Sequence, residues 1–126
     1  MAPKKARSRR LRSLKVTDAF RTFVLDQLDG LDDVMPRAMF GGVGLYCRGV
    51  FFGIIASDVL YLKVDDTNRR DYERAKMGPF TPYPDRSGTM EYFAVPIEIL
   101  EQPSDLAEWA RKAVDVAKRG ERRAKR

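Results

Sequence analysis

The most reactive side chain in this sequence is the thiol of Cys47, and the chain contains no histidine that could activate it. A cysteine nucleophile or redox sensor needs a pKa that a nearby base or cation has lowered. Arg48 is the next residue, but neighbouring side chains on a strand point to opposite faces. We therefore predict that Cys47 is a small, buried core residue. One cysteine without histidine also cannot supply the usual zinc ligands, so we expect no metal.

The segment Gly41-Gly42-Val43-Gly44 has the glycine density of a phosphate-binding loop. A dinucleotide-binding loop, however, requires a third glycine in its fingerprint and a helix that begins there, and a P-loop requires Gly-Lys-Ser/Thr. Here a strand pattern follows and a lysine does not. The glycines are better explained by a strand bulge, or by the close approach of a helix or an aromatic ring.

Two pairs of carboxylates, Asp32-Asp33 and Asp65-Asp66, have the chemistry for acid–base catalysis or magnesium binding. The first pair lies in a predicted loop and the second at a predicted helix start, where aspartate is favoured for capping alone. The most polar local cluster is Lys63, Asn68 and Arg69, which we interpret as a salt-bridged hinge between strand and helix. Small-molecule binding at this cluster is the alternative. We assign no catalytic residue and no cofactor, and we expect that the protein is not an enzyme.

An antiparallel meander is predicted between Met39 and Val64, where three apolar strand patterns are joined at Arg48-Gly49 and Ser57-Asp58. Both faces of the second strand are apolar. One face is predicted to carry Val50, Phe52, Ile54 and Ala56, and the other Phe51, Gly53 and Ile55.

Helical patterns flank this meander. A first helix, capped at Thr17 or Asp18, has apolar positions at Phe20, Phe23, Val24, Leu28 and Leu31. We predict that the segment from Leu31 to Arg37 is a connection, because it contains Pro36 and two aspartates. A polar helix is predicted over 65–77. A strand over 89–95 and a single helical turn over 96–100 follow.

The last helix, capped at Ser104 after Pro103, places Trp109 on its apolar face. Trp109, Phe20, Phe23 and Phe52 are predicted core residues. The order is helix, three strands, helix, one or two strands, helix. This order predicts an α+β domain with helices packed on one antiparallel sheet of about five strands.

Charge is strongly segregated along the chain. The 24 basic and 18 acidic residues give a net charge of +6, but residues 1–15 carry +7 and residues 118–126 carry +5. Subtracting these two ends leaves −6 for residues 16–117. We therefore expect a basic, disordered N-terminal tail, a folded domain over 16–117 and a basic C-terminal tail. Nucleic-acid affinity is expected mainly in the tails, as weak and non-specific binding.

Candidate contact residues follow from these patterns. The candidate interaction surface on the domain comprises Phe51, Tyr61, Lys63, Asn68, Arg69 and Tyr92. The candidate nucleic-acid contacts are Lys4, Lys5, Arg7, Arg9, Arg10, Arg12, Arg122, Arg123, Lys125 and Arg126. We expect a soluble, cytoplasmic protein without membrane contact, because the sequence has a single cysteine, no secretory segment and no apolar run of about 18 residues.

An ordered series of short motifs resembles the N-terminal domain of the TfoX/Sxy family. The series includes MFGGVGLY at 39–46, GVFFG at 49–53 and LYLKVD at 60–65, and continues through Asn68-Arg69, Tyr72-Glu73, Pro79-Phe80, Tyr92-Phe93, Val95-Pro96, Leu100-Glu101 and Trp109-Ala110-Arg111. The resemblance covers roughly residues 16–117.

The resemblance implies a fold similar to secretion-chaperone-like α+β domains, which often dimerise. It also implies a role in regulating natural competence genes in bacteria, where a member acts with the cyclic-AMP receptor protein. Full-length members carry a second, C-terminal domain, and this sequence ends soon after the Trp109 helix. We therefore expect a stand-alone interaction module. Its expected partner is a protein such as a transcription factor, and homodimerisation is a further expectation. The alternative functions are nucleic-acid binding through the basic tails and small-molecule binding.

Overall fold

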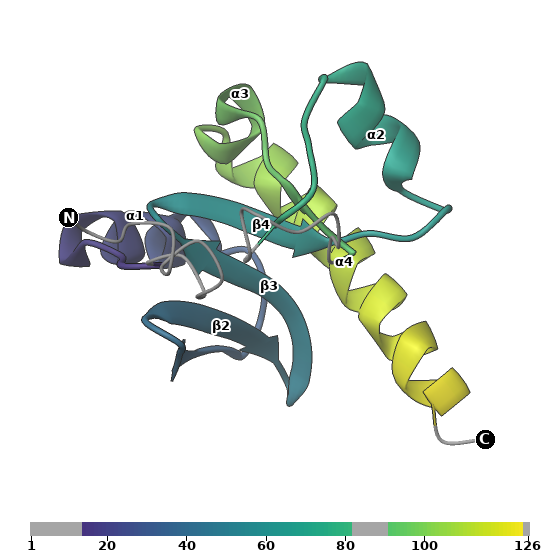
Figure 1. Cartoon of the computed structure of the whole chain (residues 1–126), viewed down its shortest axis with the longest axis horizontal. Coiled ribbons are helices and arrows are strands. Elements are labelled where there is room, and N and C mark those ends of the chain that lie inside the picture. Colours follow the sequence, from purple (N-terminus) through teal and green to yellow (C-terminus); the bar gives the residue numbers. More distant parts are fainter. Residues whose placement is uncertain (1–13, 82–90, 125–126) are drawn as a thin grey trace, which may run out of the picture.

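The computed structural model describes residues 14–81 and 91–124. Within them a five-stranded antiparallel sheet, in the order β1-β2-β3-β4-β5, is covered by helices (Figure 1). The elements are α1 (Asp18–Gln27), β1 (Val34–Met39), β2 (Gly42–Cys47), β3 (Val50–Ala56), β4 (Val59–Lys63), α2 (Arg69–Arg74), β5 (Tyr92–Ala94), α3 (Ile97–Leu100) and α4 (Pro103–Ala124). The predicted α+β class, with its sheet of about five strands, is confirmed.

Three consecutive two-residue hairpins form the first four strands. The turn residues are Phe40-Gly41, Arg48-Gly49 and Ser57-Asp58, and all six have positive φ. A type I′ turn requires positive φ at both central positions, and its twist matches that of the flanking strands. The two breaks predicted from the sequence are therefore tight hairpin turns.

A β-bulge in β3 changes which side chains share a face. Tyr46 pairs with Phe51 and Leu45 pairs with Gly53, so Phe52 is an extra residue in β3. As a result Phe52 and Ile55 pack on the helix side, whereas Phe51, Ile54 and Ala56 pack on the other side. The predicted strict alternation along β3 is wrong for Ile54, Ile55 and Ala56, because the bulge shifts the alternation by one residue.

The main core lies between the sheet and the helices. Helix α4 passes across β3 and β4 and extends beyond them toward the C-terminus (Figure 1). Its small, buried residues Ala110, Ala113 and Ala117 let the helix lie close to Leu62 and other sheet residues in one continuous core cluster. The cluster is completed by Val24 of α1, Leu28 at the C-cap of α1, Tyr72 of α2 and Leu100 of α3.

A smaller cluster lies on the opposite face of the sheet. Its buried members are Leu14, Ile54, Ala56, Phe80 and Tyr92. Helix α1 is joined to the β3–β4 turn, because Thr17 donates from its backbone N–H and its hydroxyl to the Asp58 carboxylate at 2.8 and 3.0 Å. Thr17 also caps α1, accepting from the Phe20 N–H at 3.1 Å, as predicted.

Three local predictions need correction. Residues 34–37 belong to strand β1 rather than to a connection, because Pro36 lies on an edge strand, where proline is tolerated. Helix α2 covers only 69–74, since hydrogen-bonded turns hold residues 65–68. Phe23 is 37% exposed rather than core, because α1 packs through Val24 and Leu28.

The two basic ends differ in what the structure describes. Residues 118–124, assigned to a C-terminal tail, continue helix α4. Of the N-terminal segment, Leu14 is buried in the second cluster, and residues 1–13 lie outside the described part of the chain. Among the residues that the structure describes, no helix is both long enough and apolar enough to cross a bilayer.

Candidate functional site: an aromatic sheet face and two polar clefts

A row of aromatic rings crosses the face of the sheet that the helices leave uncovered. Tyr46 of β2 stacks on Phe51 of β3 with ring centroids 5.1 Å apart, and Phe51 lies 5.5 Å from Tyr92 of β5. A cation lies over each end ring, with Arg37 5.6 Å from Tyr46 and Lys63 5.0 Å from Tyr92. We call these five residues the aromatic row. Its cations lie at the distance at which ring and cation attract each other.

The bulge and one glycine create this row. The bulge places Phe51 opposite Tyr46, on the face away from the helices. A Cβ atom on Gly44 would lie 3.2 Å from the Phe51 ring and 3.4 Å from the Tyr46 ring, so a larger residue would push these rings away by a few tenths of an ångström. The prediction that this glycine segment permits the close approach of an aromatic ring is confirmed.

Two exposed hydrophobic side chains lie on the β1–β2 hairpin beside the aromatic row. Met35 pairs with Tyr46 across the strands and is 62% exposed, and Phe40 in the turn is 77% exposed. Opposed residues of an antiparallel pair share a face, so Met35 adds to the side of the sheet that carries the row. We call Met35 and Phe40 the hairpin patch.

The structure brings together four of the six predicted surface residues. Phe51, Lys63 and Tyr92 belong to the aromatic row, and Tyr61 packs on Phe80 beside it, with centroids 4.9 Å apart. Tyr92 is buried, however, so its ring supports the row from within rather than offering a surface.

Asn68 and Arg69 have structural contacts of their own. The Asn68 side chain accepts from the Asp65 N–H at 2.9 Å and donates to the Lys63 carbonyl at 3.1 Å, and it is buried. Arg69 forms ion pairs with Asp66 at 3.3 Å and Glu91 at 3.4 Å. These contacts confirm a hydrogen-bonded and salt-bridged hinge between β4 and α2, and they remove Asn68 from the candidate surface.

A polar cleft of about 490 Å³ lies beside this hinge. Lys63, Arg69, Arg119 and Arg123 supply its positive charge, and Asp65, Asp66 and Glu91 its negative charge. Arg119 donates to Asp65 at 3.3 Å and to the Thr67 hydroxyl at 2.8 Å, so α4 closes one wall of the cleft. These internal pairs involve Arg69 and Arg119, so the cleft contains one more cation than carboxylates.

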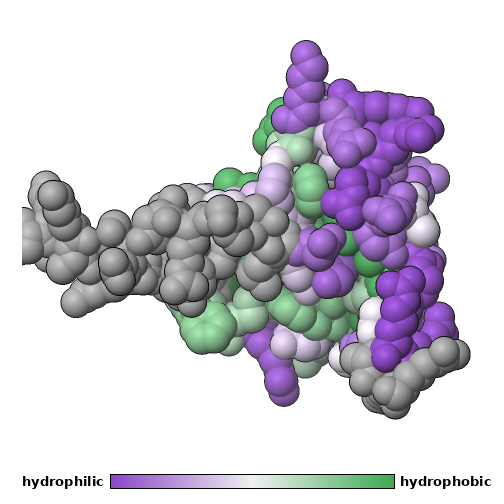
Figure 2. Space-filling view, turned by 45° about the vertical axis from the view of Figure 1, so that its right-hand side comes forward, coloured by the Kyte–Doolittle hydropathy of each residue, from purple (hydrophilic) through white to green (hydrophobic). Residues whose placement is uncertain are grey.

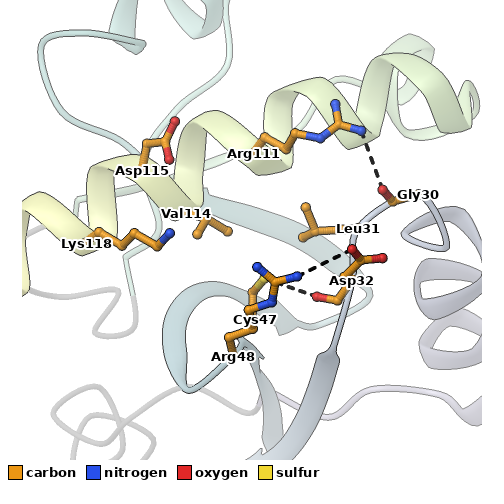
Figure 3. Close-up of a pocket in the computed structure, with 9 residues that line it drawn as sticks. All are labelled: Gly30, Leu31, Asp32, Cys47, Arg48, Arg111, Val114, Asp115 and Lys118. Atoms are coloured by element: carbon orange, nitrogen blue, oxygen red, sulfur yellow. Dashed lines mark hydrogen bonds and ion pairs between the residues drawn. The ribbon is translucent and has the colours of Figure 1, made fainter.

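Cys47 lies at a second cleft, of about 350 Å³, between α4 and the turn after β2 (Figure 3). Its thiol donates to the Asp32 carbonyl at 3.2 Å and is buried, as predicted. Burial raises the pKa of the Cys47 thiol, although Arg48 and Lys118 act in the opposite direction. A raised pKa leaves little thiolate at neutral pH, so this environment disfavours nucleophilic chemistry.

Some of the remaining predicted site residues lie within the described range and others lie outside it. Arg122 and Arg123 are exposed on α4, whereas Lys4, Lys5, Arg7, Arg9, Arg10, Arg12, Lys125 and Arg126 lie outside the described residues. Within 14–81 and 91–124, no group of three or more acidic or cysteine side chains is arranged to hold a metal ion.

Sequence reasoning missed part of the aromatic row and all of the hairpin patch. Arg37 and Met35 were missed because β1 was interpreted as a connection, and Tyr46 because its partner depends on the bulge. One signal was present in the sequence. Phe40-Gly41 between two apolar runs has the spacing of a two-residue hairpin turn, which would have predicted β1.

Comparison with known families matches this chain to one domain model. The TfoX N-terminal domain model covers residues 26–117 of the 126 residues, which includes every element from the end of α1 to the middle of α4. No curated protein matches the chain.

Proposed function

The chain belongs to the TfoX N-terminal domain family, and from this premise we propose that it is a non-enzymatic protein-interaction module in competence-type transcriptional regulation. The proposed contact surface is the hairpin patch together with the exposed part of the aromatic row. The proposed partner is a transcription factor or another regulatory protein.

The observation that carries the proposal is the conformation of Phe40. Its φ is +50°, a backbone region that is unusual for a bulky residue, and its ring is 77% exposed. The left-handed region costs about 1–2 kcal/mol for a non-glycine residue. The ring gains little packing within the chain in return, and a partner pocket would supply that packing. Exposed aromatic residues of this kind often serve as anchors in protein interfaces.

The chemistry of the partner follows from the residues around Phe40. Met35 and the Tyr46 ring offer apolar area, and Arg37 adds a positive charge at the edge. A complementary surface has an apolar pocket with carboxylates at its rim.

Strand addition at the β1 edge is a less favourable mode of contact. Met39 and Gly42 flank the turn and form a hydrogen-bonded pair. Hydrogen-bonded and non-hydrogen-bonded pairs alternate along β1 and β2, so Pro36 and Leu45, three positions further from the turn, form a non-hydrogen-bonded pair. The Pro36 nitrogen therefore faces outward without a proton, which interrupts the row of donors that an added strand would need.

The test uses Phe40→Asn, because asparagine suits the left-handed turn position and removes only the ring. Ile97→Asn is the matched control, since Ile97 is 57% exposed on α3, outside the proposed surface. The full chain and both variants are used for affinity purification from the native host, and binding of each captured protein is then measured with purified components. We expect Phe40→Asn to weaken partner binding about 30-fold, the size of an interface hot spot, and Ile97→Asn to have no effect.

Two further measurements complete the test. Expression of competence-type genes in a host that lacks the protein should be restored by the wild type and by Ile97→Asn, but not by Phe40→Asn. Sedimentation of the purified chain detects self-association. Equal partner binding by Phe40→Asn would contradict the proposed surface, and self-association that depends on Phe40 would instead assign the surface to a homodimer.

A further inference from the structure

We propose that the C-terminal half of α4 is an ordered binding site for the phosphate backbone of a nucleic-acid duplex. Residues 111–123 of this helix contain six basic and two acidic residues, a net charge of +4, although the domain over 16–117 is acidic overall. We call the six cations the basic ridge; they are Arg111, Lys112, Lys118, Arg119, Arg122 and Arg123. This site lies on the helix rather than on the face proposed for protein binding.

The spacing of the ridge residues produces two parallel rows. Arg111, Lys118 and Arg122 follow the spacing i, i+7, i+11, and Lys112, Arg119 and Arg123 repeat it one residue later. At about 1.5 Å per residue each row is about 16 Å long. Figure 2 shows hydrophilic side chains covering the surface where α2 and the C-terminal half of α4 lie.

Structural contacts explain only part of the ridge. Lys112 pairs with Asp71 at 3.0 Å, and Arg119 pairs with Asp65 at 3.3 Å. In contrast, Lys118, Arg122 and Arg123 have no ion-pair partner among the described residues, and all three are exposed. These three cations are therefore available to an external anion.

The helix dipole does not account for the pattern either. Arg122 and Arg123 lie in the last turn, where a positive charge is favourable, but Lys118 lies more than one turn earlier, and the dipole effect falls off within the last turn. Lys118 and Arg122, and likewise Arg119 and Arg123, are like charges four residues apart, and such pairs destabilise a helix. A bound polyanion would remove this repulsion.

Each of the two clefts that flank α4 is lined by one more cation than carboxylates. Arg48 and Arg111 lie with Lys118 around the cleft that contains Cys47 (Figure 3). On the other flank, Lys63, Arg69 and Arg123 line the cleft beside the hinge, where Asp66 and Glu91 pair with Arg69. Phosphates bound along the ridge would therefore have further cations on both sides.

A nucleic-acid duplex fits this surface better than an anionic membrane does. The apolar residues of α4, including Leu106, Ala110 and Val114, are buried in the core, so the helix has no exposed apolar face to insert into lipid. Phosphate-backbone binding needs only positioned cations. The expected binding is independent of base sequence and strongly dependent on salt.

The experiment measures binding of the full chain to a fluorescent, mixed-sequence DNA duplex of about two helical turns. Fluorescence anisotropy gives the affinity between about 50 and 200 mM salt. The ridge variant combines Lys118→Gln, Arg122→Gln and Arg123→Gln, which leaves the paired Arg119 in place. If each of the three cations contacts one phosphate, the plot of log affinity against log salt becomes less steep by about 2.7 in the ridge variant. We also expect the affinity at low salt to fall at least about tenfold.

Two control variants lose the same three charges at other places, so all three variants have a net charge of +3 instead of +6. The first control replaces the exposed arginines Arg21 of α1 and Arg70 and Arg74 of α2 by glutamine. The second control replaces Lys4, Lys5 and Arg7 by glutamine. Circular dichroism verifies that every variant is folded. Both controls should retain more affinity and a steeper slope than the ridge variant.

Several outcomes would overturn the proposal. These are an absence of duplex binding by the wild type, an unchanged affinity and slope in the ridge variant, or an equal loss in either control variant. Phosphatidylserine vesicles provide the membrane comparison. Vesicle binding without duplex binding would assign the ridge to a membrane surface instead.

Discussion

The guanidinium of Arg119 donates to the carboxylate of Asp65 at 3.3 Å, and so links the C-terminal half of α4 to the loop after β4. The same loop is tightened because Asp65 accepts from the N–H and the hydroxyl of Thr67 at 2.8 and 2.6 Å. Helix α4 therefore stabilises the hinge through this ion pair, whereas the buried Asn68 side chain stabilises it through hydrogen bonds to the backbone.

The Asp65 link predicts a stability change at acidic pH. Partial burial raises the pKa of the Asp65 carboxyl, but hydrogen bonds from Thr67 and Arg119 outweigh it and leave the pKa below its ordinary value. This stabilisation is present above about pH 4 and is lost as the pH falls through the lower pKa of the folded state. Urea unfolding at several pH values should show that Asp65→Asn lowers the free energy of unfolding near neutral pH by less than about 1 kcal/mol, and less in acid.

Asp66→Asn is the control for this profile, because the Asp66 side chain is 98% exposed and water screens its ion pair with Arg69. We expect it to follow the wild type across the pH range. A difference between Asp65→Asn and wild type that stays constant down to low pH would contradict the assignment.

Replacing Asn68 should destabilise the fold substantially. Asn68→Ala leaves the Asp65 N–H and the Lys63 carbonyl without their side-chain partner in a part-buried loop. We expect chemical denaturation to show a loss of about 2 kcal/mol. The exposed Glu73→Ala, on the adjacent helix α2, should change stability little. A loss below that of Glu73→Ala would show that Asn68 is dispensable.

Removing the Tyr72 hydroxyl should stabilise the protein. The ring packs against Trp109 and Phe93 with centroids 4.7 and 5.8 Å away, but the buried hydroxyl has no hydrogen-bond partner in the described part of the chain. Tyr72→Phe keeps the ring contacts and removes a polar group whose burial is uncompensated. We expect thermal unfolding to show a gain of up to about 1 kcal/mol. A clear loss would indicate that the hydroxyl has a partner in solution.

Two glycine substitutions should have opposite effects. A Cβ atom on Gly42 would lie 2.7 Å from the Ile55 carbonyl oxygen, and this backbone atom cannot move without disturbing the β2–β3 ladder. Gly42→Ala should therefore cost about 1–3 kcal/mol. Gly120 is in α4 with open space around it, so Gly120→Ala should add about 0.5–1 kcal/mol through helix propensity. Denaturation midpoints of both variants test the pair, and equal signs would be inconsistent with it.

The Phe40→Asn variant should be more stable than the wild type while binding its partner less well. Asparagine tolerates positive φ better than phenylalanine, and Asn-Gly is the preferred type I′ turn. We expect a gain of about 1 kcal/mol in the free energy of unfolding. A loss of stability would mean that the Phe40 ring contributes to the fold, and weaker partner binding would then have a structural cause.

The sequence alone predicted the elements whose signals are local. The Thr17 cap, the two turns at Arg48-Gly49 and Ser57-Asp58 and the apolar face of the Trp109 helix each depend on a few neighbouring residues. Burial of Cys47 also followed from the sequence, because the apolar pattern of its strand is local and the absence of histidine is a property of the composition.

Only the tertiary structure decided the composition of the surface sites. The bulge at Phe52 determines which rings share a face, and it appears only when β2 and β3 pair. Edge-strand status makes Pro36 compatible with β1, and Arg119 reaches Asp65 across 54 residues of chain. Local propensities act within a few residues, whereas register, sheet edges and long-range ion pairs depend on which distant segments contact each other. A single sequence does not specify these long-range contacts.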